Sequence, residues 1–355
     1  MGIPTWRVAA LLFGSGLTAL VYQTSWFREL RLVFGASTAA SAAVLAIFMG
    51  GLGLGGALLG RRADRSPNPL RLYARLEFGV ALSAAITPLL VVLIREIYIR
   101  LGGSPALGLT GASLVRIVLT GLVLGIPTVL MGGTLPAAAR AVESVADAGR
   151  RKLAVLYGAN TLGAVTGAVI STFALLELYG NRRTLWIAAL VNLLIAVVAH
   201  SLSRRADVTP SEGEAEVVFA SAVGEPTVDE EPSRGRETPY GFVLAAAAAV
   251  GFIFFVMELV WYRMLSPLLG GSTFTFGLIL AVALAGIGLG GLIYSLFGQS
   301  RPATTLQFAI TCGAEALLIA VPFAIGDRIA VLAIFLREIG RFGFEGQVAG
   351  WTVIT

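Results

Sequence analysis

The chain has 355 residues, of which 56% are hydrophobic and only 13% are charged, and its formal net charge is +5. With a mean hydropathy of +0.84, it has too little polar surface to cover a water-soluble globule of this length. The composition therefore predicts a polytopic α-helical membrane protein and excludes a soluble enzyme domain. The arginines are scattered between apolar runs, which argues against a nucleic-acid partner and is typical of orientation in a membrane.

Apolar stretches long enough to cross a bilayer, about 20 residues each, recur along the chain. We place them at about 8–27, 36–60, 73–95, 112–139, 153–178 and 184–200, and then at about 240–260, 272–297 and 306–325. A tenth begins near Gln347 and is cut off at Thr355. We expect the first segment to be a retained span and not a cleavable signal peptide, because no convincing Ala-x-Ala site follows it.

A polar stretch, residues 201–238, separates two groups of spans. It is acidic and carries proline, serine and threonine, which is the composition of a disordered linker. We therefore expect a first membrane half at 1–200, a linker at 201–238 and a second, incomplete half at 239–355. Basic residues are more frequent in the loops on the side of the N-terminus. This bias predicts an inner, cytoplasmic membrane protein whose N-terminus and linker are cytoplasmic.

The two halves carry an internal repeat at a constant offset of 235 residues. This offset aligns residues 22–28 with residues 257–263, so that Trp26 falls on Trp261 and Arg28 on Arg263. Six spans precede the linker, so both halves start on the same side of the membrane. The pattern predicts a parallel repeat, as between the two halves of major facilitator transporters. A tryptophan beside an arginine at a helix end is expected to be an interfacial anchor.

Glycine-rich runs also superpose at this offset. One of them contains the spacing of a dinucleotide fingerprint, but it lies inside an apolar helix and lacks the strand and the later acidic residue that such a site needs. Small residues let helix backbones approach closely, so we assign these glycines to helix packing. They are Gly51, Gly53, Gly55, Gly56, Gly286, Gly288, Gly290 and Gly291.

Residues able to carry chemistry are few. Cys312 is the single cysteine and His200 the single histidine, so we expect no disulfide framework and no metal site, and we name no catalytic residue. Polar residues inside spans are costly in lipid and need partners. They could form a site between the halves that binds an amine or another cation, or they could pair with nearby arginines or backbone and hold helices together. The candidates for substrate binding are Glu258, Gln23, Glu77, Arg116, Asn160 and Glu315.

Four segments together resemble the membrane part of transmembrane spermidine synthase-like proteins. They are Gly16–Arg28, Phe48–Gly56, Pro127–Pro136 and Leu156–Ala164. That family is similar to major facilitator proteins in this region and carries a soluble aminopropyltransferase domain after its helices. The family pattern has a glutamate shortly before Trp-x-Arg, which is kept here as Glu258, whereas the first half has Gln23.

The resemblance implies polyamine biosynthesis, with this chain as the membrane-embedded domain that anchors a catalytic domain and handles polyamine. Aminopropyl transfer requires a Rossmann-like domain that holds decarboxylated S-adenosylmethionine and the amine. No such unit of strand, glycine loop and helix is visible between Met1 and Thr355, so we expect no cofactor in this chain. The alternative is a major facilitator-like transporter or a non-enzymatic membrane scaffold subunit. Expected partners are the lipid bilayer and a polyamine, with a homo-oligomer or a membrane complex left open.

Overall fold

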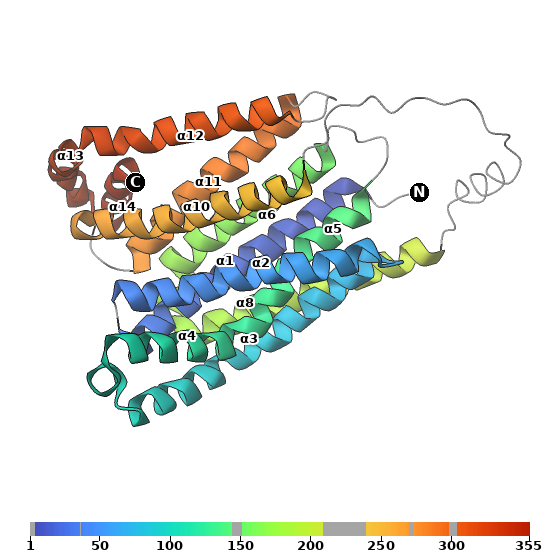
Figure 1. Ribbon diagram of the computed structural model, residues 1–355, viewed down its shortest axis with the longest axis horizontal. Coiled ribbons are helices and arrows are strands. Elements are labelled where there is room, and N and C mark those ends of the chain that lie inside the picture. Colours follow the sequence, from blue (N-terminus) through green and yellow to red (C-terminus); the bar gives the residue numbers. More distant parts are fainter. Residues whose placement is uncertain (1–3, 36, 144–150, 209–238, 270–272, 298–303) are drawn as a thin grey trace, which may run out of the picture.

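The computed structural model describes residues 4–35, 37–143, 151–208, 239–269, 273–297 and 304–355. Over these ranges the chain is a bundle of long helices without strands (Figure 1). The first group of helices is α1 (Thr5–Phe34), α2 (Thr38–Asp64), α3 (Pro69–Arg100), α4 (Gly103–Gly132), α5 (Thr134–Val142), α6 (Arg151–Ile170), the π-helical segment η1 (Ser171–Leu175), α7 (Leu176–Leu178) and α8 (Gly180–Val208). The second group is α10 (Tyr240–Leu269), α11 (Thr273–Phe297), α12 (Thr305–Ile325), α13 (Arg328–Leu336), the 3-10 segment η2 (Arg337–Phe342) and α14 (Phe344–Ile354).

Within the described ranges, nine helical segments are long and apolar enough to cross a membrane. They coincide with the nine complete spans that the sequence predicts, from Thr5–Phe34 to Thr305–Ile325. Large apolar side chains cover the outer surface of the bundle, among them Leu109, 81% exposed, and Phe323, 86% exposed. A surface of this kind is solvated by lipid and not by water. The chain is therefore a multi-pass helical membrane protein.

Local signals explain where several helices begin. The Ser37 side chain accepts a hydrogen bond from the backbone N–H of Ala40 at the start of α2. Asn68 does the same for Arg71 at the start of α3, where Pro69 occupies the first helical position. Such side chains satisfy backbone donors that have no partner inside the helix.

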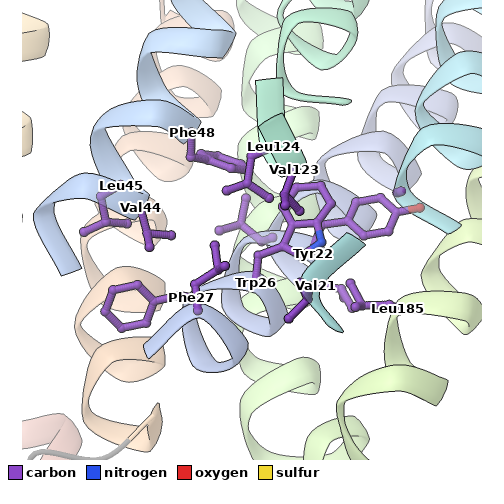
Figure 2. Close-up of a cluster of buried hydrophobic side chains, with 14 of the residues drawn as sticks. Val21, Tyr22, Trp26, Phe27, Val44, Leu45, Phe48, Val123, Leu124 and Leu185 are labelled. Atoms are coloured by element: carbon purple, nitrogen blue, oxygen red, sulfur yellow. The ribbon is translucent and has the colours of Figure 1, made fainter. Parts of the chain in front are cut away.

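The core lies around α1, which packs most extensively against α6 and then against α8. α2 packs against α4, and α3 against α8. Figure 2 shows the centre of this core, where Trp26 lies among apolar side chains that include Phe48 and Leu124. The second group joins the first mainly through α11, which runs along α6. Long apolar helices thus meet along their lengths, and the inner faces are closed to lipid.

Two details differ from the expected domain bounds. α8 continues to Val208, so residues 201–208, expected to begin a disordered linker, are helical. No glycine or proline interrupts this stretch, and its arginines favour helix. Residues 209–238 of the expected linker lie outside the described residues. The last helix, α14, begins at Phe344, just before the expected start near Gln347.

The two groups have matching element bounds. An offset of 235 residues carries Thr5 onto Tyr240 and Phe34 onto Leu269, which are the first and last residues of α1 and α10. The same offset carries Thr38, the first residue of α2, onto Thr273, the first residue of α11. The parallel repeat and its likeness to major facilitator proteins stay predictions.

Candidate functional site

Three aromatic side chains meet where α1 contacts α10 and α11, and we call them the aromatic cluster: Phe27, Tyr262 and Phe276. The Phe27 and Phe276 rings stack with centroids 4.0 Å apart, and Tyr262 meets them edge-on at 6.3 Å and 5.8 Å. The guanidinium carbon of Arg31 lies 5.3 Å from the Phe27 ring centroid and 5.6 Å from that of Tyr262. The cluster therefore joins the two groups of helices, and the Arg31 guanidinium lies within cation–π distance of two of its rings.

Glu258 lies one helical turn before Tyr262 on α10 and is 4% exposed. Neither of its carboxyl oxygens has a hydrogen-bond partner among the described residues. Arg263 is exposed and makes no ion pair with it in this part of the chain. A carboxyl at such a depth is costly unless a proton or a cation neutralises it. Glu258 is thus a candidate for binding a cation.

Gln23 lies one turn before Phe27 on α1, is 3% exposed, and its amide nitrogen also lacks a partner among the described residues. Residues four apart share a helix face. Because Phe27 contacts Tyr262, Gln23 and Glu258 each lie one turn before a residue of the contact between α1 and α10. These are the two positions that the predicted repeat aligns.

Glu77 occupies a different place, a set of buried polar residues on α1, α3 and α8 that we call the polar cluster: Ser15, Thr18, Tyr73, Glu77 and Asn192. Each is at most 7% exposed. The Asn192 amide nitrogen donates to the Glu77 carboxyl and, at 3.3 Å, to the Glu77 backbone carbonyl. The Thr18 hydroxyl donates to the Asn192 amide oxygen. The hydroxyl groups of Ser15 and Tyr73 lie beside the same carboxyl group, whose Oε1 has no hydrogen-bond partner in the described structure.

The other candidates for substrate binding lie apart from these two places. Arg116 is 5% exposed on α4, where its guanidinium donates to the Ser104 hydroxyl at 2.6 Å and lies 5.9 Å from the Tyr98 ring centroid. Asn160 is half-buried on α6, and its backbone carbonyl lies against Gly16. Glu315 is exposed on α12. The structure therefore does not gather the six candidates into one site.

Trp26 corrects the expectation of an interfacial anchor. Its side chain is 0% exposed, stacks on Tyr22 with centroids 5.2 Å apart and donates its indole N–H to the Thr87 hydroxyl at 2.9 Å. A buried acceptor on α3 takes the place of the headgroups that an anchor would meet. Trp261 is half-buried and packs against the apolar cluster that holds Leu265. The first arginine of the motif, Arg28, donates to the Leu176 backbone carbonyl at 3.5 Å.

The glycines of the two runs have unlike surroundings. A Cβ atom at Gly55 would lie 1.9 Å from the Val129 carbonyl oxygen, and one at Gly51 would lie 1.9 Å from the Thr128 hydroxyl oxygen. A Cβ atom at Gly56, Gly288 or Gly291 would make ordinary or tight contacts with α4 or α6. Open space surrounds the positions that a Cβ atom would take at Gly53, Gly286 and Gly290. Close approach between helices is therefore confined to part of each run.

No group of three histidine, cysteine, aspartate or glutamate side chains converges within the described ranges. Cys312 is half-buried and free. Two places can hold a cation by their chemistry, Glu258 at the boundary between the groups and the polar cluster around Glu77.

Sequence reasoning missed the hydroxyl residues of the polar cluster. Their signal was present, since Ser15 and Thr18 share a helix face at a spacing of three, and Tyr73 and Glu77 share one at a spacing of four. What the sequence does not show is that these faces meet around Asn192, which is 115 positions from Glu77.

Comparisons with protein-family models, with curated proteins and with solved structures found no match.

Proposed function

We propose that this chain is the membrane-embedded part of a spermidine synthase-like protein and that it binds an amine at Glu258, between two related membrane halves. The observation that carries the proposal is the buried carboxyl of Glu258, both of whose oxygens lack a hydrogen-bond partner among the described residues. A primary ammonium group offers three donors and one positive charge. It would satisfy both oxygens and neutralise the carboxylate in one step.

The surroundings of Glu258 suit an organic cation. The half-buried ring of Tyr262 lies one turn away on the same helix and can cover methylene groups. Gln23, one turn before Phe27 on α1, offers an amide oxygen that accepts a hydrogen bond without adding a second charge. A linear amine could therefore place one end at Glu258 and its apolar part along the aromatic rings.

The matching bounds of α1 with α10 and of α2 with α11 support two parallel halves. In transporters built from repeats, the substrate site lies near the middle of the membrane where the repeats meet. Gln23 and Glu258 occupy equivalent positions of the proposed repeat, each one turn before a residue of the aromatic cluster. We place the N-terminus and the linker on the cytoplasmic side of an inner membrane, on the basis of the arginine and lysine bias.

Aminopropyl transfer belongs to the proposal only through the family resemblance. It would need a soluble domain that binds decarboxylated S-adenosylmethionine, and no such domain occurs in the described residues. The alternative function is a major facilitator-like transporter or a scaffold subunit without chemistry of its own. The gene sequence beyond Thr355 distinguishes these functions, because a glycine-rich loop between a strand and a helix, followed by acidic residues, would favour the enzyme.

A thermal-unfolding panel on the purified chain tests amine binding. Putrescine and spermidine should raise the midpoint of unfolding, whereas neutral diols of matched length and dicarboxylates should not, because only a cation neutralises Glu258. Equal shifts with the diols, or no shift with any amine up to millimolar concentration, would remove the proposal.

A further inference from the structure

The polar cluster on α1, α3 and α8 lies outside the proposed amine site and contains more hydrogen-bond acceptors than donors. Both N–H groups of Asn192 are used by Glu77, and the Thr18 hydroxyl donates to Asn192. The remaining donors are the hydroxyl groups of Ser15 and Tyr73. Against them stand a carboxylate with four acceptor sites, an amide oxygen and three hydroxyl oxygens.

Two polar atoms of the cluster, Glu77 Oε1 and the Tyr73 hydroxyl, make no hydrogen bond of ordinary geometry in the described structure, although the hydroxyl lies beside the carboxyl group. Both residues are at least nine-tenths buried, at 1% and 0% exposure. They lie on the same face of α3, at a spacing of four, beside the Ser15 side chain of α1. Buried oxygens on a shared face without a well-formed hydrogen bond can accept from a further donor or coordinate a cation.

We propose that this cluster is a binding site for one sodium ion, with the Glu77 carboxylate, the Asn192 amide oxygen and the hydroxyl oxygens of Ser15, Thr18 and Tyr73 as ligands. Hard cations take oxygen ligands of these kinds. A bound ion occupies several acceptors at once, whereas a proton on Glu77 would supply one donor only. The one carboxylate of the cluster balances a single positive charge, which selects a monovalent ion over a divalent one.

The charge balance supports the same assignment. The cluster contains no lysine, arginine or histidine that could balance the charge of Glu77, and its other titratable member is Tyr73. Another tyrosine, Tyr22, lies on the same face of α1 as Ser15 and Thr18. An ionised Glu77 would therefore stand uncompensated in the bundle, at a cost that an ion removes. Sodium would also tie together three helices that are far apart in sequence, so that its binding should stabilise the fold.

The test measures the thermal unfolding of the purified full chain in sodium chloride, potassium chloride and choline chloride at equal ionic strength. Sodium should raise the unfolding midpoint by several degrees over choline and over potassium. Glu77→Gln and Thr18→Val should abolish this rise, whereas Thr18→Ser, which keeps the hydroxyl oxygen, should retain it. Equilibrium binding of radioactive sodium to the same purified variants gives the affinity directly. The affinity of Thr18→Val for sodium should be at least about tenfold lower than that of the unaltered chain, as expected when a ligand oxygen is removed.

The sodium site and the amine site share no residue. Glu258→Gln should therefore retain the sodium effect, and its result separates failure of this proposal from failure of the proposed function. Equal stabilisation by all three salts would contradict the sodium site. An unfolding midpoint that changes with pH but not with sodium would also contradict it, and would assign a proton to Glu77. If Glu77→Gln does not fold, the pair Thr18→Val and Thr18→Ser still tests the sodium site. Loss of the sodium effect in both variants, or in neither, would contradict the site.

Discussion

The rings of Phe27 and Tyr262 meet edge to face across the boundary between the two groups of helices, with centroids 6.3 Å apart. The two residues are 235 positions apart, which is the offset of the predicted repeat. An axis that related two parallel halves would pass between residues of this kind, because equivalent positions meet only close to such an axis. The pair therefore marks the place where a shared site would lie.

The energetic coupling of this pair is the first prediction. Phe27→Leu and Tyr262→Leu should each destabilise the chain, and the double variant should lose less than the sum by about 0.5–1.5 kcal/mol, which is the usual strength of an aromatic pair. The measurement is a double-mutant cycle from reversible unfolding in detergent. Phe34→Leu combined with Tyr262→Leu is the control, since Phe34 contacts Tyr98 instead. Additive losses for Phe27 and Tyr262 would show that the two halves are not coupled here.

The second prediction tests the contact between α6 and α11. A Cβ atom at Gly291 would lie 3.6 Å from the Gly158 Cα atom, so the two Cα atoms are at most about 5 Å apart, within the range that a disulfide spans. In a Cys312→Ala background, Gly158→Cys with Gly291→Cys should cross-link under mild oxidation. Gly158→Cys with Gly290→Cys should not, because a Cβ atom at Gly290 has no neighbour within 4 Å. Proteolysis in the linker followed by gel electrophoresis reports the link, and equal yields from both pairs would contradict this packing.

The third prediction separates two glycines of one run by the sign of the effect. Gly55→Ala should lower the stability by about 1–3 kcal/mol or more, because its Cβ would lie 1.9 Å from the Val129 carbonyl oxygen and would push α4 away. Gly53→Ala should instead raise it by about 0.5–1 kcal/mol, since the added methyl group meets open space and alanine favours helix. Thermal unfolding of both variants decides the matter. A loss at Gly53 as large as that at Gly55 would show that the packing of α2 is wrong.

The sequence alone predicts the helices well, because long apolar runs are themselves the signal for membrane spans. It predicts burial of single residues less well. Trp26 beside Phe27 and Arg28 has the pattern of an anchor, yet its N–H meets Thr87, which is 61 positions away on α3. A contact of this kind depends on which helix faces pack together, and the weak amphipathicity of apolar helices leaves those faces unmarked.

The candidate site shows the same limit. The sequence singles out Glu258 correctly as buried, since a charged residue inside an apolar run is rare and costly. It also includes Glu315, which has the same pattern but is exposed on the outer helix α12. The difference lies in the surroundings of each helix, because α10 contacts α2 and α11 whereas α12 presents its apolar faces outward.

Glu315 therefore supplies the matched control for the central claim. The most direct measurement is equilibrium binding of radiolabelled spermidine to the purified chain and to Glu258→Gln and Glu315→Gln, prepared at equal yield. Glu258→Gln removes one charge from the proposed site and should weaken binding about 10- to 100-fold, the worth of a charge-assisted hydrogen bond. Glu315→Gln makes the same chemical change on an exposed face and should bind as the unaltered chain does. Equal affinity of all three proteins would contradict an amine site at Glu258.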